Sequence, residues 1–148
     1  MRERKGDVSM PDDKLLLKDL RVCIGCGTDN PRGLHLQFEW QGDVLVSHWT
    51  PGAEYQGWAG VVHGGMLGLV LDEMMGQIVY RCGHLSPTAE LTVRYRQPVP
   101  IQKPLTLLGF KPEGRRILLC RAEIRNEAGD LMAEAVGKFL PSPRDTGA

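Results

Sequence analysis

A His-Gly-Gly tripeptide precedes an apolar stretch that carries two adjacent carboxylates. The tripeptide is His63–Gly65, and Asp72 and Glu73 follow within a predicted helix over residues 64–80. The first N–H groups of a helix are unpaired and carry a partial positive charge, which suits them to a carbonyl oxygen that becomes an oxyanion. Because a carboxylate is costly to bury in an apolar helix, Asp72 and Glu73 need an explanation beyond packing.

Glycines on this helix indicate that something approaches its backbone closely. Gly64 and Gly65 would let a substrate carbonyl reach their amides, or they simply permit a tight turn into the helix. Asp72 follows Gly64 by eight residues, about 12 Å along a helix, so one carbonyl carbon cannot reach both groups within one chain. This distance predicts a two-fold dimer with shared sites. Gly68 and Gly76 share the face of Asp72, which favours a partner backbone or an acyl group there.

The two carboxylates point in directions about 100° apart around the helix axis, so they face different surroundings. Asp72 fits a general base that activates water, a direct nucleophile, or a buried carboxylate paired with an arginine. We expect Glu73 to face another surface or to make an ion pair. His63 either orients the loop before the helix or touches the substrate, and we favour the structural role.

Two-fold alternation of apolar residues surrounds the helix and predicts strands. Two strands precede it and four follow, over residues 34–40, 44–49, 89–95, 105–110, 117–124 and 131–140. We therefore predict an α+β fold, in which an antiparallel sheet of five to six strands wraps around one long central helix. We expect residues 1–20 to be an N-terminal arm with a helical turn or two over 14–20, residues 21–140 the single domain, and residues 141–148 a tail.

Composition excludes several classes of protein. The 148 residues include 18 Lys plus Arg and 18 Asp plus Glu, and the sequence pI is near 6.9, so no nucleic-acid footprint is visible. The longest apolar run, residues 66–71, is far shorter than the ~20 residues that span a bilayer. With no signal-peptide pattern at the amino terminus, we expect a cytoplasmic protein with neither a membrane nor a nucleic-acid partner.

Four cysteines are expected to be reduced at that location. Cys82 and Cys120 are predicted to pack in the core, whereas Cys23 and Cys26 form a Cys-x-x-Cys pair. A structural zinc site would want four ligands; His35 could be a third, and no fourth is evident. We therefore expect a turn with buried thiols and no metal.

From about residue 23 to residue 139, the chain resembles the hot-dog-fold acyl-CoA thioesterases, particularly the branch of the phenylacetic-acid-pathway and 4-hydroxybenzoyl-CoA thioesterases. The resemblance rests on His63–Gly65, on Asp72 nine positions after the histidine, and on the strand Thr88–Pro98 after the helix. The stretch Cys23–Leu34 looks like the lead-in of one subgroup. The family implies hydrolysis of a thioester to an acid and free coenzyme A, by homodimers with shared sites that we expect to pair into homotetramers.

The resemblance also implies roles for individual residues. A glycine amide after the histidine polarises the thioester carbonyl, Thr88 helps to hold the attacking water, and Glu73 is the reserve for Asp72. Many relatives carry an asparagine six positions before the histidine, where this chain has Gly57, so Gln56 is the candidate to supply an amide. No cofactor is implied beyond the coenzyme A of the substrate.

Residues for binding the substrate follow from its chemistry. Apolar side chains at the start of the helix could line an acyl pocket or belong to the core, namely Trp58, Val61, Val62, Met66 and Leu69. Arginines could hold the phosphates of coenzyme A or lie on solvated surfaces, namely Arg94, Arg96, Arg115 and Arg116. We expect a small aromatic or short- to medium-chain acyl-CoA. The alternatives are a non-catalytic acyl-CoA-binding protein and a hydratase or dehydratase acting on acyl thioesters.

Overall fold

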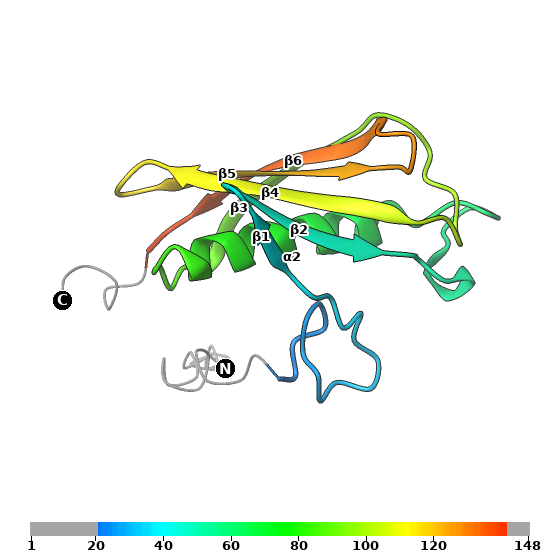
Figure 1. Ribbon diagram of the computed structural model, residues 1–148, viewed down its shortest axis with the longest axis horizontal. Helices are drawn as coiled ribbons and strands as arrows, with labels where there is room; N and C mark the ends of the chain where they lie inside the picture. Colours follow the sequence, from blue (N-terminus) through cyan, green and yellow to red (C-terminus); the bar gives the residue numbers. More distant parts are fainter. Residues whose placement is uncertain (1–20, 142–148) are drawn as a thin grey trace, which may run out of the picture.

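The computed structural model describes residues 21–141. One helix lies along one face of a six-stranded sheet, as Figure 1 shows. This arrangement confirms the predicted fold. The expected arm, with its helical turns over residues 14–20, and nearly all of the expected tail lie outside the described residues.

All neighbouring strands of the sheet are antiparallel, in the order β1-β2-β4-β5-β6-β3. The strands are β1 (Glu39–Gln41), β2 (Val44–Trp49), β3 (Thr88–Tyr95), β4 (Leu105–Glu113), β5 (Leu118–Arg125) and β6 (Leu131–Phe139). The long helix is α2 (Gly64–Arg81), and a single 3₁₀ turn, η1 (Ala53–Tyr55), precedes it. The sheet is continuous from β1 to β3, so β3 is an edge strand although it lies in the middle of the sequence.

One face of α2 forms the core with the sheet. Seven of its buried side chains are at most 3% exposed, namely Leu67, Val70, Leu71, Met74, Met75, Ile78 and Val79. Two strand glycines let the helix come close: a Cβ on Gly109 would lie 2.9 Å from Ile78, and one on Gly137 would lie 3.1 Å from Met75. The apolar face therefore holds α2 in place against the sheet.

Two element boundaries differ from the sequence prediction. The expected strand over residues 34–40 is wrong for most of its length, because β1 covers only Glu39–Gln41. Leu36 is nevertheless 5% exposed, so the alternation there reports contact with the core rather than sheet pairing. The strand predicted over residues 105–110 is longer than expected, since β4 continues to Glu113 through a register shift between Phe110 and Glu113. Such an irregularity accommodates a proline that cannot donate to the ladder.

The two edges of the sheet differ in length and in exposure. β1 has three residues, whereas β3 has eight. Seven of the eight residues in β3 are exposed, including Leu91 at 37% and Tyr95 at 54%. Natural sheets usually keep free edges short or covered, because a long free edge pairs with another chain. Within residues 21–141, no helix combines the length and hydropathy needed to cross a membrane.

Candidate functional site

The amino terminus of α2 is capped by the side chain of His63. Its Nδ1 accepts a hydrogen bond from the N–H of Gly65 at 2.8 Å. Nδ1 is therefore the acceptor of this bond, and Nε2 is the ring nitrogen left for other contacts. The N–H of Gly64, in contrast, has no acceptor among residues 21–141. Of the two glycine amides singled out by the sequence, one is engaged by the cap and the other is available to a ligand.

Tyr95 of β3 packs against the first residue of the helix. Its hydroxyl donates to the carbonyl oxygen of Gly64 at 2.8 Å. A Cβ on Gly64 would lie 3.3 Å from the Tyr95 ring, so a larger residue would press on this contact. Packing against Tyr95, as well as access to the amide, therefore favours glycine at position 64. Sequence reasoning missed Tyr95, because the residue lies 31 positions away from Gly64 and no local pattern links the two.

Asp72 lies against the other end of the same strand. The hydroxyl of Thr88 donates to Oδ1 of Asp72 at 2.7 Å, and the Asp72 side chain is half-buried. No basic side chain of the described residues forms an ion pair with Asp72, so the structure does not bear out its pairing with an arginine. The carboxylate keeps Oδ2 for a proton or a water molecule, and Thr88 holds the group in a fixed orientation.

The loop before α2 encloses an open hollow beside Gly64. Its volume is about 430 Å³, and it is lined by Gly57, Trp58, Val62, His63 and Gly64. The side chain of Trp58 is 87% exposed there. Gln56 does not extend into the lining, because its Oε1 accepts the N–H of Gly60 at 2.9 Å within the loop. A Cβ at Gly57 would lie 3.2 Å from the ring of His63, so the loop packs tightly where many relatives have asparagine.

Glu73 belongs to a different neighbourhood from Asp72. The thiol of Cys23 donates to Oε2 of Glu73 at 3.4 Å, and Nε2 of Gln77 donates to Oε1 at 3.3 Å. Burial, followed by the nearby Glu73 carboxylate, raises the pKa of the Cys26 thiol well above its usual value. The ring of His35 points elsewhere, with Nε2 2.6 Å from the carbonyl oxygen of Asn30. The sequence singled out Cys23 and Cys26 but did not connect them with Glu73.

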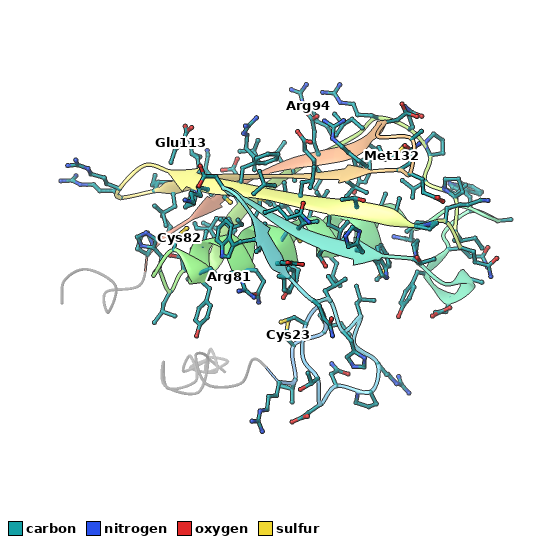
Figure 2. The ribbon with its side chains drawn as sticks, in the orientation of Figure 1. Cys23, Arg81, Cys82, Arg94, Glu113 and Met132 are labelled. Carbon is teal, nitrogen blue, oxygen red and sulfur yellow. The ribbon has the colours of Figure 1, made fainter. Side chains whose placement is uncertain are left out.

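The remaining candidates do not gather at one place. Val62 is 3% exposed, and Met66 and Leu69 pack partly buried against the core. Arg96 pairs with Glu134 at 3.0 Å, and Arg94 points away from α2 on the outer face of the sheet in Figure 2.

Arg115 and Arg116 are exposed in the turn between β4 and β5. That turn follows Glu113, which lies at the same end of the molecule as Arg81 and Cys82 (Figure 2). Gly64 begins the opposite end of the helix. No cluster of cations therefore forms beside Gly64 within one chain of the described residues.

Known proteins share this sequence pattern and this fold. Residues 59–133 match the family model described as the thioesterase superfamily. Over 100 residues, the chain is 38% identical to acyl-coenzyme A thioesterase THEM4 of Xenopus laevis, and the alignment covers 65% of this chain and 44% of that protein. The chain therefore spans less than half the length of this curated relative.

Solved structures agree with the sequence comparison. The crystal structure of RHA08564, a thioesterase superfamily protein, matches with a TM-score of 0.76 at 31% identity, over 81% of this chain and 63% of that chain. A hypothetical thioesterase from Streptococcus pneumoniae TIGR4, solved with coenzyme A, matches with a TM-score of 0.67 at 21% identity, over 72% of this chain and 85% of that one. At such low identity, the second match shows the shared fold alone.

Proposed function

Because the chain belongs to the thioesterase superfamily, we propose that it is an acyl-CoA thioesterase that releases a carboxylic acid and free coenzyme A. One observation supports this reaction most directly. A half-buried carboxylate, Asp72, and an N–H without an acceptor, that of Gly64, both lie beside the exposed edge strand β3. The first can act as a base and the second can stabilise an oxyanion.

A second copy of the chain would bring these two groups together. Within one helix they are about 12 Å apart along the axis, at about 1.5 Å per residue. Thr88 and Tyr95 mark the two ends of β3, next to Asp72 and Gly64 respectively. If β3 pairs with its own copy in antiparallel orientation about the strand's midpoint, Thr88 of each chain faces Tyr95 of the other. Asp72 of one chain then lies beside Gly64 of its partner, at two equivalent sites.

The face of α2 next to Asp72 also supports such a dimer. A Cβ on Gly76 would meet nothing within 4 Å in the described residues, so no part of the chain itself explains this glycine. Close approach of a partner helix would explain it, and Leu91 and Tyr95 would become buried in the same contact. We propose the homodimer as the active unit, with pairing of dimers into a homotetramer as its extension.

The proposed reaction needs no group beyond the two chains and water. Thr88 holds Oδ1 of Asp72, and Oδ2 takes a proton from water as that water attacks the thioester carbon. The carbonyl oxygen gains negative charge, which the Gly64 N–H of the other chain stabilises. When the carbon–sulfur bond breaks, the proton passes from Asp72 to the departing thiolate of coenzyme A. His63 keeps the loop in place by capping Gly65, and its side chain also lines the hollow beside Gly64.

The hollow beside Gly64 supports an acyl group of modest size. At about 430 Å³, it has the volume of a small-ligand pocket, and Trp58 and Val62 give it an apolar wall. We therefore propose small aromatic or short- to medium-chain acyl-CoA substrates, which also fit the predicted cytoplasmic location. Arg115 and Arg116 are the proposed contacts for phosphates of coenzyme A, because they form no ion pair among the described residues.

Thiol release from a panel of short, medium, long and aromatic acyl-CoAs tests the proposal. Wild type should turn over at least one class, and Asp72→Asn should lose that turnover while remaining folded by circular dichroism. Saturable binding of acyl-CoA without any thiol release would instead identify a non-catalytic binding protein.

Sedimentation tests the shared site separately. Wild type should sediment as a dimer or tetramer, and Leu91→Lys should weaken association and turnover together, because it places a charge on the exposed edge strand. A stable monomer with full activity would contradict the shared site.

A further inference from the structure

The Cys-x-x-Cys segment and α2 bring three metal-ligating side chains together on the side of the helix away from Asp72. The thiols of Cys23 and Cys26 and a carboxylate oxygen of Glu73 all lie within 4.8 Å of one another. In Figure 2, Cys23 lies on the loop below the helix, far from the sheet. This cluster takes no part in the proposed thioester chemistry.

Two of the separations within the cluster are close to the edge of a tetrahedron around zinc. With Zn–S and Zn–O bonds of about 2.3 and 2.0 Å, a sulfur and an oxygen ligand lie about 3.5 Å apart. Sγ of Cys23 is 3.4 Å from Oε2 of Glu73, and the amide of Gln77 is 3.4 Å from Sγ of Cys26. Because the nitrogen and oxygen of an amide exchange places by a half turn, Gln77 can present its oxygen as the fourth ligand.

The loop is built to support a thiolate. The N–H of Gly25 donates to Sγ of Cys23 at 3.3 Å, and a donor of this kind orients and stabilises a ligating sulfur. The N–H of Gly27 donates to the carbonyl oxygen of Cys23 at 2.8 Å and closes the turn of the loop. A Cβ on Gly25 would lie 2.6 Å from the Glu73 side chain, so a larger residue would push this carboxylate out of its place under the loop. The backbone of the loop is thereby fitted to both sulfur and carboxylate.

The contacts of Glu73 also leave its negative charge available to a metal cation. No lysine, arginine or histidine among residues 21–141 forms an ion pair with Glu73. Its neighbours are instead two thiols and an amide, so the negative charge of Glu73 stands beside two groups that can bind a metal ion. Two thiolates and one carboxylate are ligand types that zinc prefers, and the neutral amide oxygen completes four-fold coordination.

We propose that Cys23, Cys26 and Glu73, with the amide oxygen of Gln77, bind a structural zinc ion that fastens residues 21–36 to the middle of α2. Binding converts the two thiols to thiolates and releases their protons to solvent. The ion would fix the helix at the residue next to Asp72, while leaving Asp72 itself free to face β3. This proposal does not rest on the thioesterase function, because the metal is detected without any substrate.

Metal content of the full chain is the first test. After reconstitution with zinc under reducing conditions and removal of free metal, wild type should retain about one zinc ion per chain. Cys23→Ser and Cys26→Ser should each retain less than about a tenth of that amount, whereas Cys82→Ser, a cysteine outside the cluster, should match wild type. Glu73→Gln should weaken zinc binding by at least about tenfold, and Glu39→Gln on exposed β1 should not.

A second measurement uses only the wild-type chain and therefore does not depend on whether a variant folds. Cobalt added in place of zinc should give a thiolate-to-cobalt charge-transfer band that zinc abolishes. Zinc should also protect Cys23 and Cys26, but not Cys82, from alkylation until a chelator is added. Wild type without bound metal and without the cobalt band would overturn the proposal, as would unchanged zinc content in both serine variants. A Cys23–Cys26 disulfide in a metal-free chain purified with reductant would overturn it in favour of redox chemistry.

Discussion

Asp72 and Glu73 are neighbours on one helix, yet the fold gives them opposite surroundings. Asp72 contacts Thr88 on the exposed edge strand β3, where solvent and a second copy can reach it. Glu73 contacts Cys23 beneath a loop of its own chain. The same functional group therefore has two different sets of contacts, because a rotation of about 100° around the helix axis turns it toward a different part of the molecule.

The strongest test of this contrast is to neutralise each carboxylate in turn. Asp72→Asn should lower kcat by about 100-fold or more, since it removes the proposed general base. Glu73→Gln should lower kcat by less than about tenfold and should act through the loss of zinc, because its side chain faces away from the proposed reaction. Steady-state thiol release, with zinc content measured on the same samples, gives both values. Equal losses of kcat in the two variants, with zinc retained in Glu73→Gln, would contradict the different roles proposed for the two carboxylates.

Thermal unfolding tests whether the proposed zinc ion at Glu73 stabilises the fold. At a free zinc concentration about 100 times the dissociation constant, binding stabilises the folded state by about 2.7 kcal/mol. For a chain of this size, a chelator should then lower Tm by about 5–10 °C. Asp72→Asn should keep this response to the chelator, and Cys23→Ser should lose it. A Tm that does not change with chelator in wild type would argue against a stabilising metal.

Removing the hydrogen bond to Asp72 should have a smaller effect. Thr88→Val leaves the carboxylate without its donor, and a lost hydrogen bond of about 1 kcal/mol corresponds to about a fivefold fall in kcat. Thr88→Ser keeps the hydroxyl and should retain most of the activity. If Thr88→Val and Thr88→Ser lost activity equally, the methyl group rather than the hydroxyl would be what matters.

The smallest expected effect is at the other end of β3. Tyr95→Phe removes the hydroxyl that donates to the Gly64 carbonyl, and at a half-exposed position this should destabilise the fold by about 0.5 kcal/mol. Denaturant unfolding at fixed protein concentration measures the change. Val22→Ala, an exposed change in the loop, serves as a control of similar size. A loss of several kcal/mol would contradict this expectation and would mean that the hydroxyl makes contacts beyond the Gly64 carbonyl.

The sequence predicted the fold correctly wherever the local residue pattern and the tertiary contacts favour the same structure. The helix was expected over residues 64–80 and ends at Arg81, followed by Gly83 with φ of +90°. The pattern failed at residues 34–38, where alternating apolar side chains contact the core without pairing as a strand. Two-fold alternation reports which side chains face inward, and hydrogen bonding to a neighbouring strand is a separate condition.

The sequence likewise predicted some features of the candidate site and not others. Its chemistry-bearing residues, His63, Gly64 and Asp72, were identified from type and spacing, because helix termini and helical period are local properties. The distinct states of the two glycine amides were not, since they depend on the side-chain rotamer of His63. The catalytic and binding roles of all these residues, and of Gln56 and the four arginines, stay predictions.

By itself, the sequence determined that one helix carries a glycine amino terminus and two carboxylates that face different directions. These properties follow from residue type and from the 3.6-residue period. Only the tertiary structure decided which partner each carboxylate meets. Thr88 lies 16 positions from Asp72, and Cys23 lies 50 positions from Glu73. Contacts over such separations form when the whole chain packs, because the buried face of α2 fixes where its other faces point.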